Sequence, residues 1–167
     1  PQEAMEKFTV LLSKAPEDTD ALFAAGSLLL SLDDAAGSGD MLARYLAKKP
    51  ADTEGWYLLA AGAERQKKYA RALEAYEKIV ALDPAQGDAW FGETRLFLTV
   101  VEEPQRGLDV LEKALAAGFK DAAAVKALLE SPGLMERDKV EAALRSRGLL
   151  PEQARTAPGT VPAQTPE

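Results

Sequence analysis

Carboxylates, lysines, tyrosines and serines are the side chains left for chemistry here, because neither cysteine nor histidine occurs among the 167 residues. This excludes thiol nucleophiles, triads built on histidine, disulfides and zinc sites with Cys or His ligands. Paired carboxylates can cleave glycosidic bonds, but the sequence singles out no pair. Catalysis would need a strongly perturbed, buried carboxylate pair in a pocket. We therefore expect no catalytic residue, no metal site and no cofactor, in a protein that is not an enzyme.

The negative net charge of the chain argues against a nucleic-acid partner. Asp and Glu number 27 against 20 Lys and Arg, which gives a formal net charge of -7. Proteins that bind nucleic acid present a basic surface, so no nucleic-acid partner is expected. No apolar run approaches the roughly 18 residues that a membrane span requires, so we expect no membrane-spanning segment in this chain. The composition fits a bacterial cytoplasm and a periplasm equally well, and localisation stays open.

Three series of residues recur at a step of 34 and indicate an internal repeat. Each proline of the first series follows a run with helical apolar spacing. The series are Pro16, Pro50 and Pro84; Leu22, Trp56 and Trp90; and Phe23, Tyr57 and Phe91. Apolar periodicity predicts helices at about 2–14, 19–32, 38–48, 52–66, 69–82, 87–101, 104–117, 121–130 and 136–147.

The clearest unit runs from Thr53 to Gln86. Trp56, Leu59, Ala60 and Ala63 form one helical stripe, and Ala72, Tyr76, Ile79 and Val80 form a second stripe on the next helix. This unit resembles the tetratricopeptide repeat (TPR) family, and the resemblance extends over about residues 2–118. It implies an all-α fold, a right-handed superhelical stack of antiparallel helix pairs. Trp56, at the centre of the best repeat, is expected to be buried.

The repeats suggest a division of the chain. Residues 1–18 would be the second helix of a truncated or capping repeat, and we favour truncation because the chain begins with Pro1. Three TPR-like repeats follow at 19–52, 53–86 and 87–118, and capping helices at 119–150. Residues 151–167 are rich in proline and predict a flexible tail, with docking in the groove of a neighbouring copy as the alternative.

Two repeats depart from the pattern. Two glycines in DDAAGSGD, residues 33–40, predict a late helix start at about residue 38, with Ser38 or Asp40 as N-cap. In the third repeat, Glu93 and Thr94 replace an apolar and a small residue, and the register needs one extra residue near Glu102. We expect looser helix pairing there.

In the TPR family the first helix of each pair lines the concave groove, so the resemblance implies a set of groove positions here. We expect the groove to contain the acids Asp20, Glu54 and Asp88, the aromatic residues Phe23, Tyr57 and Phe91, and Ser27, Leu58, Ala61 and Arg95. Ala24, Gly92, Leu30, Glu64 and Leu98 occupy further positions on the same face. Two alternatives stay open: the aromatic rings could pack onto adjacent helices, and the acids could serve the helix dipoles.

The resemblance implies a protein–protein interaction scaffold or adaptor that binds a peptide or partner segment in this groove. Aromatic rings would supply the affinity, and the acids would favour an apolar or basic ligand. The Lys, Asn and Arg clamp of chaperone-tail binders is missing, since Arg65 and Arg95 are the only groove cations, so acidic chaperone tails are not expected. The alternative is a structural subunit of a homo-oligomer or larger assembly, and the oligomeric state stays open.

Overall fold

The computed structural model describes residues 2–151, and this part of the chain consists of nine α-helices without a strand. They are α1 (Gln2–Lys14), α2 (Thr19–Ser31), α3 (Ala35–Lys48), α4 (Thr53–Arg65), α5 (Tyr69–Leu82), α6 (Gly87–Thr99), α7 (Pro104–Ala116), α8 (Ala122–Glu130) and α9 (Arg137–Ser146). With the exception of the start of α3, the bounds agree with those expected from apolar periodicity to within two residues.

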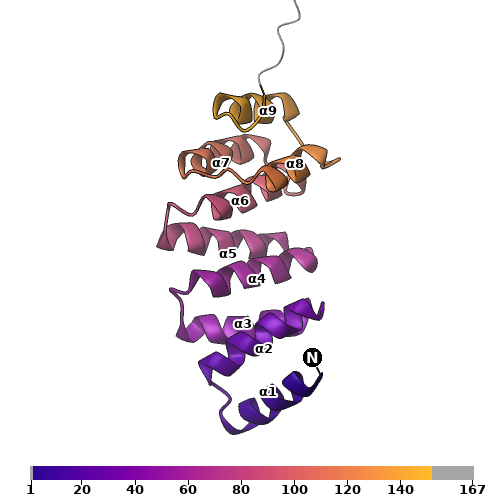
Figure 1. Cartoon of the computed structure of the whole chain (residues 1–167), viewed down its shortest axis with the longest axis vertical. Coiled ribbons are helices and arrows are strands. Elements are labelled where there is room, and N and C mark those ends of the chain that lie inside the picture. The colour runs from indigo at the N-terminus through magenta and orange to yellow at the C-terminus, as the bar shows by residue number, and fades with distance from the viewer. Residues whose placement is uncertain (1, 152–167) are drawn as a thin grey trace, which may run out of the picture.

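The helices stack in chain order along one long axis, from α1 at one end to α9 at the other (Figure 1). The most extensive packing is within the pairs α2–α3, α4–α5 and α6–α7, and each pair then packs against the next. Short helices of this length are marginal alone, so each depends on its neighbours for stability. The result is an all-α array of antiparallel helix pairs.

The apolar core is divided along the axis into three clusters. The first contains Leu42, Leu46 and Leu59, between α3 and α4. The second is built on small residues of α4 and α5, including Ala60 and Ala72, which have no exposed surface. The third joins α6 and α7 to the C-terminal helices: it contains Phe91, Leu98, Leu111, Val125, Leu128, Val140 and Leu144.

A tryptophan ties the start of a first helix to the preceding proline at two points 34 residues apart. The indole Nε1 of Trp56 donates a hydrogen bond to the Pro50 carbonyl at 2.9 Å, and that of Trp90 to the Pro84 carbonyl at 3.0 Å. These bonds explain why tryptophan and proline recur together. They also correct the expectation for Trp56, which is half-buried rather than buried, because its indole edge must reach the loop.

The expected late start of the helix in residues 33–40 is wrong. Helix α3 begins at Ala35, and its N-cap is Asp34, whose Oδ1 accepts a hydrogen bond from the Gly37 amide at 2.9 Å. A Cβ at position 37 would lie 2.6 Å from Asp34 Oδ2, so the glycine makes room for the cap rather than delaying the helix. Ser38 and Asp40 therefore lie inside α3, and Ser38 is fully buried.

The extra residue in the third repeat is confirmed by the turns inside the helix pairs. Each turn has one residue in the left-handed region: Asp33 (φ 65°), Lys67 (φ 57°) and Glu102 (φ 60°), at steps of 34 and then 35. The expected looser pairing is wrong, however. Leu98, Leu111 and Ala114 have no exposed surface between α6 and α7, because the insertion lengthens the loop and leaves the packed stripes intact.

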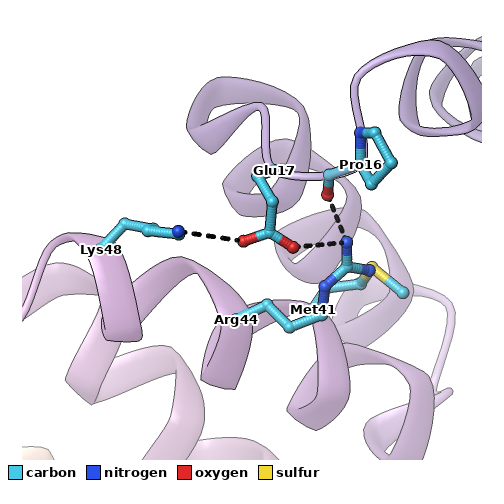
Figure 2. Close-up of polar contacts among 5 residues, drawn as sticks. All are labelled: Pro16, Glu17, Met41, Arg44 and Lys48. Atoms are coloured by element: carbon cyan, nitrogen blue, oxygen red, sulfur yellow. Dashed lines mark hydrogen bonds and ion pairs between the residues drawn. The ribbon is translucent and has the colours of Figure 1, made fainter.

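A polar cluster fastens the loop between α1 and α2 to α3 (Figure 2). Arg44 donates hydrogen bonds to the Pro16 carbonyl and to Glu17 Oε1, the latter at 3.3 Å. Lys48 Nζ lies 3.5 Å from Glu17 Oε2. Arg44 uses Nη2 for the hydrogen bonds above, and its Nη1 lies 4.0 Å from Met41 Sδ. The side chains are substantially exposed, so each ion pair contributes at most about 1 kcal/mol, and the cluster acts mainly by orienting the loop.

No helix among residues 2–151 has the length and apolar character needed to cross a membrane. The expected proline-rich tail, residues 151–167, lies outside the described residues except for Pro151, so its conformation stays a prediction.

Candidate functional site

The expected groove residues lie on three successive first helices. Helix α2 carries Asp20, Phe23 and Ser27; α4 carries Glu54, Tyr57, Leu58 and Ala61; and α6 carries Asp88, Phe91 and Arg95. The three acids are exposed, and all the others except Phe91 are half-buried. We call this surface the first-helix face. Three further positions expected on it, Leu30, Gly92 and Leu98, are instead buried. Leu30 lies next to Gly62 of α4, and Leu98 lies next to Gly107 of α7.

Each aromatic residue of the first-helix face contacts a second ring. Phe23 lies against Tyr45 with ring centroids 5.1 Å apart, and Tyr57 meets Tyr76 edge-on at 6.3 Å. Phe91 is stacked on Phe119 at 3.9 Å and is only 4% exposed. Phe91 therefore packs onto a neighbouring element, which was the alternative to a place in the groove. Phe23 and Tyr57 keep part of their surface open.

One hollow gathers the third-repeat residues of this face. It has a volume of about 350 Å³, and we call it the Asp88 hollow. Its lining residues are Tyr76, Asp88, Phe91, Gly92, Arg95, Phe119, Asp121, Ala124 and Ala127, from α5, α6, α8 and the loop before α8. A second hollow of about 430 Å³ shares Asp88, Phe119 and Asp121 with it. It extends along the start of α6 and the loop between α7 and α8, where the exposed Lys120 also lines it. Together they form an open depression, and Phe91, Phe119 and Ala124 give the Asp88 hollow an apolar floor.

The floor of the Asp88 hollow is held by a close contact and a hydrogen-bond network. A Cβ at Gly92 would lie 2.5 Å from Cζ of Tyr76, so only glycine lets the tyrosine ring cross α6 here. The Tyr76 hydroxyl donates to Glu64 Oε1 at 2.8 Å, and Arg95 forms an ion pair with Glu64 Oε2. Burial, together with Glu64, raises the pKa of the Tyr76 hydroxyl, which remains a neutral donor.

The Glu64–Arg95 ion pair decides the net charge at the surface of the Asp88 hollow. Arg95, expected as a groove cation, is compensated by Glu64 on the neighbouring first helix. Asp88 and Asp121 then leave the rim acidic. Asp121 also caps α8, because its Oδ1 accepts from the amides of Ala123 at 2.8 Å and Ala124 at 3.1 Å. The acidic rim complements a basic or neutral ligand.

Sequence reasoning missed several residues of this depression. Phe119, Asp121, Ala124 and Ala127 lie beyond the last residue matched to the repeat pattern, in the segment expected to be a cap. Phe119 had one signal: it is an isolated aromatic residue directly after Gly118, a helix-ending glycine with φ 85°. Its partner in the stacking contact could not be read from the sequence.

The described residues hold one buried carboxyl group, that of Glu93. Glu93 is 3% exposed, and the nearby Glu77 is exposed and paired with Arg106 at 3.2 Å. Within residues 2–151 no group of three or more acidic side chains is placed to hold a metal ion.

Comparison with known proteins agrees with this architecture. The family model described as "Tetratricopeptide repeat" matches residues 53–96. No curated protein matches the chain.

Solved structures of MamA have a similar fold. "Crystal structure of MamA" has a TM-score of 0.70 at 16% identity and covers 86% of this chain and 84% of its own. "Crystal structure of MamA protein" has a TM-score of 0.70 at 15% identity, with coverages of 95% and 87%. "MamA RS-1 ArsTM double mutant" has a TM-score of 0.66 at 21% identity, with coverages of 88% and 86%. At these identities the likeness concerns the fold.

The resemblance of the sequence to the tetratricopeptide repeat family is confirmed: residues 53–96 match the model of that family, and residues 2–151 fold as a TPR-like solenoid of antiparallel helix pairs.

Proposed function

We propose that the chain is a protein-interaction scaffold that holds a peptide or a partner segment against the first-helix face. The observation that carries this proposal is the Asp88 hollow, an open depression of about 350 Å³ at the end of that face. A repeat fold by itself does not determine a function, whereas a site with a defined shape and charge does select its ligands.

The site favours an extended ligand with an apolar side chain and a basic neighbour. The apolar floor of Phe91, Phe119 and Ala124 suits a side chain inserted from above. Asp88 and Asp121 stand at its edge, and an arginine or lysine next to the inserted side chain would meet them. Further along the same face, the half-buried Tyr57 and Phe23 offer aromatic surface at low rotamer cost.

A peptide-binding experiment with a matched pair of variants tests this function. Tyr57→Ala removes an aromatic ring from the first-helix face, and we expect it to weaken the binding of apolar and basic peptides selected from a library by about tenfold, a typical loss for an interface aromatic. Fluorescence anisotropy of labelled peptides gives the dissociation constants.

The control is Tyr69→Ala. Tyr69 is half-buried against the same core cluster as Tyr57, but it lies at the start of α5, away from the first-helix face. Both variants lose a ring from one cluster, so a general loss of folding would affect them alike. Equal affinity of the wild-type protein and Tyr57→Ala would exclude the first-helix face as the binding surface.

A further inference from the structure

A third hollow lies on a different part of the stack, where α6 is flanked by α5 and α7. It has a volume of about 430 Å³ and we call it the Glu93 hollow. Glu77, Val80 and Ala81 line it from α5, Trp90 and Glu93 from α6, and Arg106, Asp109, Val110 and Lys113 from α7. Only Glu93, Val80 and Val110 among these are buried, so they form its floor, and the other charged side chains form its rim.

The preceding repeat has a counterpart of this hollow. A depression of about 390 Å³ is lined by Ala43, Leu46, Ala47, Pro50, Trp56 and Leu59. Five of these residues stand 34 positions before residues of the Glu93 hollow: Leu46 corresponds to Val80, Trp56 to Trp90 and Leu59 to Glu93. The repeat architecture therefore accepts leucine at this floor position, and the third repeat has a carboxyl group there instead.

The Glu93 carboxyl group has no partner within the described part of the chain. Its Oε1 is buried without a hydrogen bond, and no Lys or Arg nitrogen of residues 2–151 forms an ion pair with it. A buried polar atom without a partner costs free energy that a bound donor would recover.

Neither of the two cations on the rim forms an ion pair with Glu93. Arg106 pairs with Glu77 at 3.2 Å and with Glu103 at 3.6 Å, and its guanidinium lies 4.3 Å from the centroid of the Phe97 ring. Lys113 Nζ lies 4.9 Å from the centroid of the Trp90 ring. With Glu77 and Asp109 also on the rim, the hollow carries two positive charges against three negative ones when Glu93 is ionised. One further positive charge would balance it.

We propose that the Glu93 hollow binds a primary alkylammonium group, with the ammonium paired to the Glu93 carboxylate and the alkyl chain against Val80, Ala81 and Val110. Lysine side chains and free aliphatic diamines share this chemistry. The aliphatic floor matches a chain of a few methylene groups, and the buried carboxylate matches its charged end. This site is separate from the first-helix face and does not rest on the function proposed for that face.

Proton linkage gives the site a signature. Burial, and then the charge of Glu77, raise the pKa of Glu93 to about 7, against the opposing effects of Arg106 and Lys113. An ammonium ion binds the ionised carboxylate, so its binding lowers the pKa of Glu93 and releases a proton. Affinity should therefore rise as the pH increases towards about 7 and level off above that value.

Carboxyl-carbon NMR of the full chain tests the proposal directly. The probes are N-acetyl-lysine methylamide, 1,4-diaminobutane and the uncharged N-acetyl-norleucine methylamide. We expect one or both amines, but not the norleucine probe, to lower the Glu93 pKa and to shift the Trp90 indole resonance. Binding of the lysine probe points to a polypeptide ligand, and binding of the diamine alone points to a free amine. Unchanged Glu93 titration with both amines would overturn the proposal.

Two variants separate the floor carboxylate from general charge effects. Glu93→Gln keeps the shape of the floor and should weaken amine binding by about tenfold, the usual loss for a charge-assisted hydrogen bond. Glu112→Gln removes the same charge from α7 at an exposed position that does not line the hollow, and should change the affinity less than about twofold. Equal affinity of the wild-type protein and Glu93→Gln would refute the proposal. Tyr57→Ala should leave this binding intact, so the outcome is independent of the first-helix face.

Discussion

Glu93 occupies a floor position that the preceding repeat fills with Leu59, and this exchange affects the stability of the stack. Both residues are buried, at 3% and 6% exposure. Leucine gains from burial, whereas a carboxylate loses its hydration there and gains no partner in return. The third repeat therefore contains a local conflict between the repeat pattern and the residue that occupies it, and such conflicts are typical of functional positions.

Replacing Glu93 with leucine should stabilise the protein in a pH-dependent way. The folded state holds the Glu93 proton up to a pKa of about 7, against 4.5 for an unperturbed glutamate. Between these values the folded state binds more protons than the unfolded one, so the wild-type stability falls as the pH rises and stays low above about 7. Glu93→Leu should exceed the wild type by about 3 kcal/mol at pH 8 from this effect. Chemical denaturation at pH 4 and pH 8 measures the difference.

The comparison at pH 4 is the internal control for this prediction. Both states of the wild type are then largely protonated at Glu93, so the advantage of leucine should shrink to its smaller burial contribution. An advantage that is the same at both pH values would show that the Glu93 carboxyl group titrates as an exposed glutamate does.

Glu93 also marks a limit of prediction from sequence. Its position on an apolar stripe was evident from the 34-residue step, and so was its departure from the pattern. Glutamate side chains are usually exposed to solvent, so the sequence alone favours an exposed Glu93. The α6–α7 contact, in which Leu98 and Leu111 are fully buried, fixes the rotation of α6 and keeps Glu93 buried. Phe91 was expected to face the groove, and its burial could not be predicted because its stacking partner, Phe119, lies outside the recognised repeats.

At the scale of helices, capping residues recur with the repeat. The residue before each first helix is Asp18, Asp52 or Gln86, spaced 34 apart. The two aspartates accept hydrogen bonds from amides of the first turn, at 2.8 Å for Asp18 and 3.0 Å for Asp52, while Gln86 makes no side-chain cap bond. The elements were predictable because apolar stripes and prolines recur at one step.

The start of α3 was the exception, and it gives a test of capping. Asp34→Ala removes the acceptor of the Gly37 amide and should lower the free energy of unfolding by about 1 kcal/mol. The matched control is Asp40→Ala, because Asp40 is exposed inside α3 and caps nothing there. It should not lower the stability. Thermal melting of both variants decides between Asp34 and Asp40 as the residue that starts the helix.

The α3 error has a physical explanation. Two glycines lower helix propensity by roughly 1 kcal/mol each, and on that basis the helix was expected to begin only at about residue 38, after Gly37. Tertiary packing outweighs this cost, since Ala35, Ser38 and Gly39 are buried against the following helices. Gln66 and Arg71 also donate hydrogen bonds to the carbonyls of Ala35 and Gly39, at 2.8 Å and 3.3 Å.

Across the whole molecule, stability should vary along the axis of the stack. Each helix pair packs mainly on its neighbours, so an end helix has half the support of a central one (Figure 1). Helix α1 is the extreme case, because none of its side chains from Glu3 to Lys14 is buried. Val10 and Leu11 are 55% and 42% exposed. The cluster of Glu17, Arg44 and Lys48 holds the loop after α1 rather than the helix itself (Figure 2).

Hydrogen exchange should reveal this gradient. We expect amides of α1 to exchange by local opening, at least roughly tenfold faster than those of α5, whose Ala72, Ala75 and Ile79 are fully buried. Exchange followed by mass spectrometry after proteolysis resolves the helices. Equal protection of α1 and α5 would mean that the stack opens only as one cooperative unit.

The overall architecture was predictable, and the site only in part. Three series of residues at one period indicated the helix pairs and the first-helix face, because every repeat packs against its neighbours through the same positions. The Asp88 hollow depends on where the repeats give way to α8, and Asp121 and Ala124 enter it from a segment without the repeat pattern. Contacts at such a junction depend on three-dimensional geometry rather than on period.

The paired tryptophans give the two matching hollows separate optical reporters. Trp56 lines the apolar hollow around Leu59, and Trp90 lines the Glu93 hollow, with the Lys113 ammonium 4.9 Å from its ring. Both indoles hydrogen-bond to a proline carbonyl in the same register. The two indoles therefore differ in the charged groups around them, which line only the Glu93 hollow. The emission wavelength of a variant with a single indole reports on one hollow alone.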